Sequence, residues 1–347
     1  MKDENSITVY DIADEAGVSV STVSRVLNNS APVKEKTRAR VIKVMDKYNF
    51  QPNALARSLS KKRTKTIGFI LPDITNPFFS EVYVKAERAA LDLGYSIFLS
   101  NTMNDSEVES IYLKTLVEKQ VDGIIFMGGR VNETRTDDKF AEEMKVIMKK
   151  TPIVMINGEM EGVDCYRVKT DEADGFRKGL NYLLSLGHKE IALVGGIKGI
   201  TSTDIKLDIF SQYVESAQIE TKEEWIIESG YSIEGGYEAL KQLLSLADLP
   251  TAIIAINDFI AIGVVKAAKE MGLQIPQEVS IIGFDNIYLT TIVLPAITTI
   301  SHNYQELAAK AVNIIDGINN NQVYEKEHFF DSELIIRESS IGLMNME

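Results

Sequence analysis

The stretch Thr8-Val-Tyr-Asp-Ile-Ala-Asp-Glu-Ala-Gly-Val-Ser-Val-Ser-Thr-Val-Ser-Arg-Val-Leu-Asn28 decides how the N-terminal end of this chain folds. Its apolar residues recur at helical spacing in two short runs, 9–16 and 20–28, with Gly17 between them. Glycine tolerates the positive φ that a tight turn between helices needs, and Thr8 followed by Asp11 is a capping-box start. The pattern therefore predicts a helix-turn-helix.

The second of these helices exposes Val20, Ser21, Ser24 and Arg25. Small apolar, hydroxyl and guanidinium groups can reach thymine methyls, base edges or phosphates in a DNA groove. One interpretation is a DNA-reading helix; the other is a structural three-helix bundle whose surface is polar. The helical pattern alone does not separate the two.

The chain has 347 residues, a length that predicts two or three domains. Its charge is distributed unevenly along the sequence. The formal net charge is −13, but residues 1–65 carry 13 Lys and Arg against 7 Asp and Glu, a net of +6, which leaves −19 on the rest. A basic N-terminal region joined to an acidic body is the charge balance expected of electrostatic attachment to phosphates.

The only cysteine is Cys165, which excludes an intramolecular disulfide and any metal site built on several cysteines. A catalytic thiol would need support from His188, His302 or His328; the alternative is a small buried residue. We expect no metal and no cofactor. The sequence shows neither a secretory signal at its start nor an apolar run of membrane-spanning length, so we expect a cytoplasmic protein without a membrane partner.

A third helix over 33–48 completes the N-terminal bundle, and Pro52 interrupts the helical pattern. A short helix-capable piece follows at 53–59, and then the basic stretch 61–65, which by composition is a linker. We therefore predict a DNA-binding headpiece over 1–50 and a hinge with linker over 51–65.

From residue 67 onward, short apolar runs alternate with amphipathic helices, which predicts parallel sheets covered by helices on both faces, an α/β body. The predicted strands are 67–71, 96–99, 123–127, 153–156, 191–194, 252–256 and 280–284; the predicted helices include 79–93, 107–119, 173–186, 235–246 and 259–271. This is too many strands for one compact sheet, so we divide the body into two lobes near 158–166.

Polar residues gather where the predicted strands end: Asp73, Arg130, Asn157, Asn257 and Asp285. Ligands of open α/β sheets bind beyond the carboxyl ends of the strands. Two such lobes that face each other form a cleft whose carboxylates and amides suit the hydroxyls of a sugar or polyol. Each of these residues is also a common helix cap or turn former.

The order of these parts resembles the lactose-repressor (LacI/GalR) family of transcription regulators. The resemblance is carried by residues 8–28 and 51–59, by Ile67-Gly-Phe-Ile-Leu-Pro-Asp-Ile-Thr-Asn-Pro-Phe-Phe79, by Val121-Asp-Gly-Ile-Ile125, by Leu186-Gly-His-Lys-Glu-Ile191, and by Asn257-Asp258 and Ile281-Ile-Gly-Phe-Asp-Asn286. It implies a periplasmic-binding-protein-like body in which the chain returns to the first lobe after Pro295. The implied lobes are 66–163 plus 296–324 and 164–295 plus 325–347.

The resemblance also implies a homodimer that reads a pseudo-palindromic operator. Matching positions place Val20, Ser21 and Arg25 at base edges, and Tyr10, Ser19, Thr22, Ser24 and Asn28 at the DNA backbone, with Thr8 beside them. Residues 53–60 would fold as a hinge helix on DNA, with Asn53 and Ala56 in contact and Leu59 wedged into the minor groove.

For a small-molecule effector, the family's pocket positions fall on Asp73, Phe78, Phe79, Asn157, Tyr231, Asn257, Asp285 and Tyr304. Where the family usually has arginine this chain has Lys206, a single ammonium in place of a bidentate guanidinium. Lys206 together with Arg130 would suit a phosphorylated sugar, so the expected effector is a sugar or a sugar phosphate.

Three alternatives remain beside a sugar-responsive repressor of carbohydrate genes. Catabolite control proteins of the same family take a phosphorylated carrier protein as corepressor, and share Lys119-Gln-Val-Asp-Gly-Ile-Ile-Phe-Met127; they carry a basic residue where this chain has Leu294. A transport-type sugar-binding protein would need a signal peptide. An enzyme would need a nucleophile, metal set or cofactor loop, and we expect none.

Overall fold

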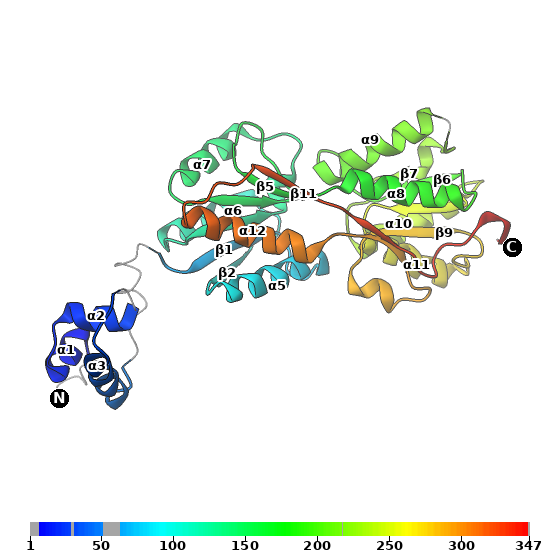
Figure 1. Cartoon of the computed structure of the whole chain (residues 1–347). Coiled ribbons are helices and arrows are strands. Elements are labelled where there is room, and N and C mark those ends of the chain that lie inside the picture. The colour runs from blue at the N-terminus through cyan, green and yellow to red at the C-terminus, as the bar shows by residue number, and fades with distance from the viewer. Residues whose placement is uncertain (1–6, 29–30, 51–62, 217, 346–347) are drawn as a thin grey trace, which may run out of the picture. The chain divides into compact units, whose positions relative to one another are not determined.

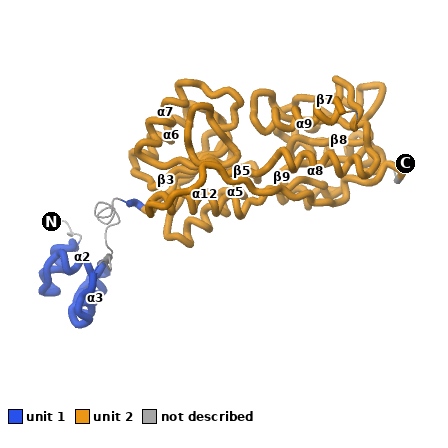
Figure 2. The backbone as a smooth tube through the Cα atoms, turned by 45° about the horizontal axis from the view of Figure 1, so that its top comes forward, with its two compact units in different colours: residues 1–64 blue, residues 65–347 orange. Residues whose placement is uncertain are grey.

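The computed structural model describes residues 7–28, 31–50, 63–216 and 218–345. The chain divides into two compact units, 1–64 and 65–347 (Figure 2). Each unit has its own buried core.

The first unit is a bundle of three helices, α1 (Val9–Ala16), α2 (Val20–Asn28) and α3 (Glu35–Lys47). The capping box is present: the Thr8 hydroxyl accepts from the amide of Asp11, and an Asp11 carboxylate oxygen accepts from the Thr8 amide at 2.8 Å. Gly17 ends α1 in the left-handed conformation at φ 61° and ψ 45°. The helix-turn-helix expected from residues 8–28 is confirmed.

A small apolar core holds these helices together, and its fully buried members are Ile12, Ala13, Ala16, Val23, Val26, Val41 and Val44. An ion pair between Lys47 Nζ and Glu15 Oε1, at 2.6 Å, fastens the end of α3 to α1. The predicted hinge contacts Asn53, Ala56 and Leu59 lie outside the described residues.

The second unit contains two six-stranded sheets (Figure 1). The first sheet has the order β11 (Glu327–Phe330), β5 (Tyr166–Thr170), β4 (Ile153–Ile156), β3 (Gly123–Met127), β1 (Thr66–Leu71) and β2 (Ser96–Asn101), all parallel. Helices α5 (Pro77–Asp92) and α12 (Tyr304–Asn319) pack on one face, and α6 (Ser106–Glu118) and α7 (Asp138–Met148) on the other.

The second sheet has the order β12 (Glu333–Ile335), β10 (Thr298–Ser301), β9 (Ser280–Asp285), β8 (Ala252–Ala255), β6 (Ile191–Val194) and β7 (Ile226–Ile227), with only β12 antiparallel to its neighbour. Helices α10 (Ile233–Leu244) and α11 (Asp258–Met271) cover one face, and α8 (Glu172–Ser185) and α9 (Thr201–Glu215) the other. Short 3₁₀ turns lie at Gly129–Asn132 (η1), Glu223–Trp225 (η2), Tyr288–Thr291 (η3) and Leu343–Asn345 (η4).

All seven predicted strands are present, and the helix-covered parallel sheets confirm the expected α/β class. The strands that the sequence pattern missed are β5, β7, β10, β11 and β12. Most of these lie at or beside a sheet edge and mix polar with apolar residues, as in Tyr166–Thr170. A strand that is buried on one side only lacks the continuous apolar run on which the prediction relied.

The lobe boundaries expected from the sequence need correction. Strand β5, expected in the second lobe, pairs with β4 through Tyr166 opposite Val154 and so extends the first sheet. Strand β10, expected in the first lobe, pairs with β9 through Thr298 opposite Ile282. The chain therefore crosses between lobes after β5, after β10 and between β11 and β12, because backbone pairing and not loop composition decides where a sheet ends.

Over the stretches that the structure describes, no helix is both long enough and apolar enough to cross a membrane.

Candidate functional site

Helix α2 presents the side chains that the sequence selected for contact with DNA bases. Ser21 and Arg25 are exposed, four residues apart on one face, and Val20 is half-buried beside them. Val23 and Val26 point into the core and fix the helix from behind. A guanidinium on an exposed helix face, supported by a rigid core, is suited to a bidentate contact with a guanine edge.

The hydroxyls at the start of α2 form a local hydrogen-bond network. Ser19 Oγ lies 2.8 Å from Ser21 Oγ and 2.9 Å from Thr22 Oγ1, and it accepts from the Thr22 amide at 3.3 Å. Ser19 therefore caps the helix whose N-terminus would approach phosphate. Tyr10, on α1, is 74% exposed.

The other residues of the headpiece that are predicted to contact DNA are Thr8, Ser24 and Asn28. Thr8 is exposed and engaged in the capping box, and Ser24 is half-buried. Asn28 ends α2, and its side chain lies outside the described part of the chain.

In the body, the two lobes touch each other at a rim formed by the segment after η1 and the loop before α9. The Thr134 amide donates to the Gly199 carbonyl at 2.9 Å, and the Thr201 hydroxyl donates to the Asn132 carbonyl at 3.0 Å. A single antiparallel bridge pairs Glu133 with Ile200. These contacts hold the strand ends of the two sheets against each other.

His302 connects the two lobes at the crossover between β10 and α12. Its Nδ1 lies 2.8 Å from Thr170 Oγ1 at the end of β5, and its Nε2 lies 3.1 Å from Asp285 Oδ1 at the end of β9. Asn157 Oδ1 accepts from the Thr170 amide at 2.7 Å, which extends the chain of contacts into the first lobe. Two predicted effector residues, Asn157 and Asp285, are thus linked through a histidine that the sequence reasoning did not select.

Asp285 has a strained backbone conformation and a carboxyl group with a shifted pKa. Its φ is 113°, a conformation that non-glycine residues rarely adopt, and the Tyr304 hydroxyl donates to its carbonyl at 2.5 Å. Burial raises the pKa of the Asp285 carboxyl, while the hydrogen bond from His302 opposes the shift. Burial also raises the pKa of the neighbouring Asp258, whose carboxylate accepts from Thr299 Oγ1 at 2.6 Å. Strain and raised carboxyl pKa values of this kind concentrate at functional sites.

Aromatic rings surround His302. The ring centroid of Phe78 lies 5.0 Å from that of His302 and 6.0 Å from that of Tyr304, and Phe79 stacks edge-on against Phe78 at 5.0 Å. Phe284 approaches the same imidazole from the second lobe at 5.4 Å. Such a group of rings offers apolar faces on which a sugar ring can stack.

On the second lobe, Tyr231 and Asn257 are joined, because the Asn257 amide donates to the Tyr231 carbonyl at 3.2 Å. Asn257 also caps α11 by accepting from the Ile260 amide at 3.0 Å. The Tyr231 hydroxyl lies 2.6 Å from Thr203 Oγ1, and burial raises the Tyr231 pKa.

Lys206 is buried on α9. Its ammonium lies 3.3 Å from Glu172 Oε2, donates to the Ile256 carbonyl at 3.1 Å, and lies 3.7 Å from the ring centroid of Phe284. The sequence selected Lys206 but not Glu172, its carboxylate partner at the start of α8.

Arg130, which the sequence predicted as an effector residue, is buried with carboxylate partners of the first lobe. Within the described residues, the ion pairs and hydrogen bonds of its side chain involve no other predicted effector residue. Arg130 is 1% exposed, with Nε 2.9 Å from Glu109 Oε2 and Nη1 2.9 Å from Glu143 Oε2. Its guanidinium also lies 4.4 Å from the ring centroid of Phe140. The side chain is therefore directed into the layer between β3, α6 and α7, because two carboxylates and an aromatic face draw it there.

Asp73 stands apart from the other predicted effector residues. It is exposed after β1 and closes a turn by accepting from the amide and the hydroxyl of Thr75, at 2.9 Å and 2.7 Å. The turn leads directly into the start of α5, where Phe78 and Phe79 lie.

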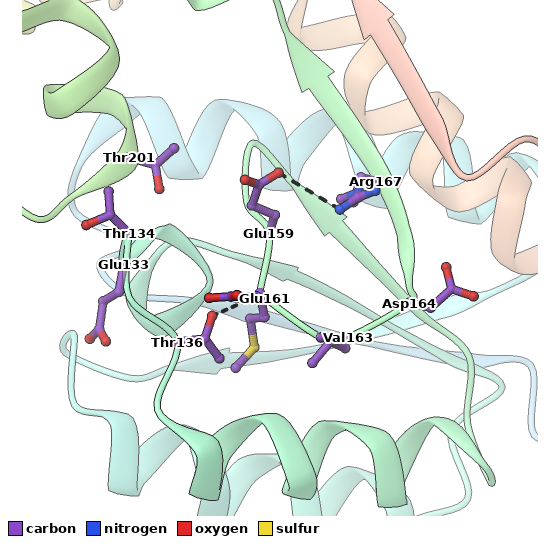
Figure 3. Close-up of a pocket in the computed structure, with 11 residues that line it drawn as sticks. Glu133, Thr134, Thr136, Glu159, Glu161, Val163, Asp164, Arg167 and Thr201 are labelled. Atoms are coloured by element: carbon purple, nitrogen blue, oxygen red, sulfur yellow. Dashed lines mark hydrogen bonds and ion pairs between the residues drawn. The ribbon is translucent and has the colours of Figure 1, made fainter. Parts of the chain in front are cut away.

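Two cavities lie in the described part of the body, and of the predicted effector residues only Tyr304 lines one of them. The larger, about 630 Å³, is lined by residues that follow η1, by the segment 159–164, by Arg167 and by Thr201 (Figure 3). Figure 3 shows Glu159 directed towards Arg167, and the cavity wall holds three further carboxylates, those of Glu133, Glu161 and Asp164. The smaller, about 310 Å³, includes Tyr304 and Arg337. We place the candidate effector site at the residue cluster, because both lobes contribute interacting side chains there.

His302 and Glu172 are the functional candidates that sequence reasoning missed. His302 directly follows strand β10, so the rule that selected Asp285 at the end of β9 would have found it had that strand been predicted. Glu172 follows β5, which was also missed. Across the described residues, no group of three or more His, Cys, Asp or Glu side chains could hold a metal ion.

Comparisons with known proteins follow the same division of the chain. Residues 8–53 match the family described as bacterial regulatory proteins, lacI family, and residues 180–340 match the periplasmic binding protein-like domain. The HTH-type transcriptional regulator DegA of Bacillus subtilis (strain 168) is 34% identical over 97% of this chain and 98% of its own length. Catabolite control protein A of Priestia megaterium is 33% identical over 92% of this chain and 95% of its own.

Among solved structures, the Lac repressor dimer bound to operator and the anti-inducer ONPF superimposes with a TM-score of 0.85. The sequence identity is 26%, and the match covers 97% of this chain and 100% of that one.

Proposed function

This chain belongs to the lacI family of bacterial regulatory proteins and is a DNA-binding transcriptional regulator, and we propose that it acts as a repressor of carbohydrate-utilisation genes. In this proposal two copies bind a pseudo-palindromic operator, and a small sugar-like effector between the lobes controls the binding. The observation that carries the proposal is the presence, in the same chain, of an exposed Arg25 on α2 and of a polar cluster around His302 and the strained Asp285, to which both lobes contribute.

Operator reading is assigned to α2. Arg25 and Ser21 share its exposed face, and Val20 adds a small apolar side chain of the size that contacts a thymine methyl. The excess of basic residues in 1–65 supplies the attraction to phosphates that does not depend on sequence. Specificity then rests on few side chains, whereas affinity rests on many.

Substitution of Arg25 tests this assignment. We expect Arg25→Ala to weaken binding to the operator in the chain's own promoter by about 1–3 kcal/mol, and to weaken binding to random duplex much less. Lys43→Ala, an exposed basic residue on α3, is the matched control and should weaken both alike. Fluorescence anisotropy at several salt concentrations measures both. Equal losses for Arg25→Ala would reduce its role to phosphate contact, and no operator preference in the unmodified protein would contradict the repressor proposal.

A second copy of the chain is expected to cover the edge of the first lobe. Strand β2 is the last strand of its sheet, and it exposes Phe98 at 38%, while α5 beside it exposes Val84 at 53% and Leu91 at 64%. Val84 and Leu91 are seven residues apart and so share one helix face. An apolar face beside an unpaired strand edge is typical of an interface between copies. Leu91→Glu should shift sedimentation towards the monomer; an unchanged dimer would place the interface elsewhere.

The effector is assigned to the cluster around His302. Amide, carboxylate and hydroxyl groups of both lobes meet there beside several aromatic rings, a composition that suits adjacent sugar hydroxyls. A ligand that binds one arrangement of the lobes better than another would change the affinity for DNA. A phosphorylated carrier protein is not proposed as partner, because Leu294, at the position of the expected basic residue, carries no charge.

A further inference from the structure

The Lys206 ammonium is already engaged by groups of its own chain. An ammonium carries three N–H donors, and here it lies at hydrogen-bonding distance from the Ile256 carbonyl, 3.1 Å away, and within 3.3 Å of Glu172 Oε2. The Phe284 ring lies against the same ammonium, with its centroid 3.7 Å away. One donor of Lys206 is thus used in a hydrogen bond, and its charge is already opposed by a carboxylate.

The other nitrogen-bearing side chains near the cluster that could receive an anion are engaged in the same way. His302 directs Nε2 to the Asp285 carboxylate at 3.1 Å. Arg337, which lines the smaller cavity, donates from Nη2 to Asn286 at 2.6 Å, and from Nη1 to the Ile297 carbonyl at 2.7 Å and Thr290 at 3.1 Å. Arg130, the cation once assigned to the effector, is enclosed in the first lobe.

Two acidic side chains of the cluster, by contrast, are not fully enclosed. Glu172 and Asp285 each keep 14% of the side chain exposed. Burial raises the pKa of Tyr231, on the second lobe, and of Tyr304, on the first, and the Glu172 charge adds to both shifts. A phosphate ester, with a charge of about −1.5 to −2 at neutral pH, would enter against these carboxylates.

We propose that the effector site around His302 selects an uncharged polyhydroxylated effector and rejects the phosphate ester of the same molecule, because Glu172 already pairs with the Lys206 ammonium. The inference rests on the effector role proposed above and narrows it. Glu172 is a specificity-determining residue. Its carboxylate neutralises the Lys206 ammonium, which would otherwise receive the phosphate, and the same carboxylate repels the phosphate directly.

Matched pairs of ligands test the proposal with the full-length, unmodified protein. The pairs are ribose and ribose 5-phosphate, glucose and glucose 6-phosphate, and fructose and fructose 1-phosphate, screened by thermal shift and followed by calorimetry for each sugar that binds. We expect the phosphate ester of a binding sugar to bind at least about tenfold more weakly. An ester that binds as tightly as its parent sugar, or more tightly, would overturn the proposal.

The variant Glu172→Gln tests the cause. It leaves an amide of the same size and frees the Lys206 charge, so the discrimination against the ester should shrink or reverse while the parent sugar still binds. Glu215→Gln removes an exposed carboxylate from the same helix as Lys206 and should leave the discrimination unchanged. Discrimination that persists in a folded Glu172→Gln protein would show that Glu172 is not its cause.

The outcomes separate this inference from the proposed function. If no sugar and no ester binds while operator binding is intact, the sugar effector itself is wrong and the inference falls with it. If only esters bind, the effector site stands and the inference alone is overturned. The comparison between each sugar and its phosphate ester is made first on the unmodified protein. Its result therefore stands even if the Glu172→Gln variant fails to fold.

Discussion

Arg130 in the first lobe and Lys206 in the second are both buried cations paired with carboxylates, and their surroundings differ. Arg130 has carboxylate oxygens of Glu109 and Glu143 at 2.9 Å and is 1% exposed. Lys206 has one carboxylate partner, Glu172, which keeps 14% of its side chain exposed. The sequence assigned both cations to one phosphate-binding effector site.

The difference shows that a buried charged side chain can either stabilise the interior of a lobe or belong to the candidate effector site. The Arg130 cluster ties η1 to α6 and α7 and thereby supports the rim segment that meets the second lobe. The Lys206 pair belongs to the neighbourhood of Asp285, Tyr231 and Tyr304. We therefore expect substitutions in the first pair to affect stability, and substitutions in the second to affect recognition.

The largest expected effect is that of Arg130→Met. At pH 8 it removes the cation from two carboxylates. Glu143 keeps Ser110 and Lys114 as partners, but Glu109 is fully buried, so the free energy of unfolding should fall by about 3–5 kcal/mol. Urea denaturation followed by circular dichroism measures it.

Two variants serve as controls for Arg130→Met. Adding Glu109→Gln should recover part of the loss, because the buried charge is then removed with its partner. Glu142→Gln, next to Glu143 on α7 but paired with the exposed Lys145, should leave the stability unchanged. An Arg130→Met protein as stable as Glu142→Gln would remove the distinction between the two cation sites.

The next effect is a pH dependence that arises at Glu109. Burial raises its pKa from an ordinary value of 4.5 to about 7, against the attraction of Arg130. Because the folded state holds this proton more tightly, the stabilisation is complete below about pH 4.5 and is lost as the pH rises through 7. Relative to Glu109→Gln, the unmodified protein should lose about 3 kcal/mol of unfolding free energy between pH 5 and 8.

The quantity to measure is the difference in unfolding free energy between the unmodified protein and Glu109→Gln, because all other titrating groups contribute equally to both. Urea midpoints taken at intervals from pH 5 to 8 give it directly. A constant difference across that range would mean that Glu109 keeps its charge and that Arg130 fully compensates it.

The smallest effect on stability is expected from Lys206→Met. Glu172 then loses its partner but retains access to water, so we expect a loss of about 1–2 kcal/mol, less than for Arg130→Met. Effector binding should change more than stability does. A stability loss equal to that of Arg130→Met would show that both pairs serve the interior of their lobes.

Sequence reasoning recovered most of the candidate cleft because strand ends converge in a parallel sheet. Asn157, Asn257 and Asp285 were found in this way, and the structure links Asn157 and Asp285 through Thr170 and His302. His302 and Glu172 were missed because β10 and β5 lack the long apolar runs of central strands. The surroundings of Arg130 were not predicted, because the sequence pattern records which residue follows a strand, but not which way its side chain turns.

By itself, the sequence determined the helix-turn-helix and the alternation of strands and helices, because both depend on periodicity and capping within short segments of chain. The number of predicted strands then indicated the two-lobed body. Only the tertiary structure decided which lobe receives β5 and β10, and which carboxylates pair with Arg130 and Lys206. Those partners come from distant segments, such as Glu172 for Lys206, and the energy of a charge depends on the burial and the neighbours that the folded chain brings to it.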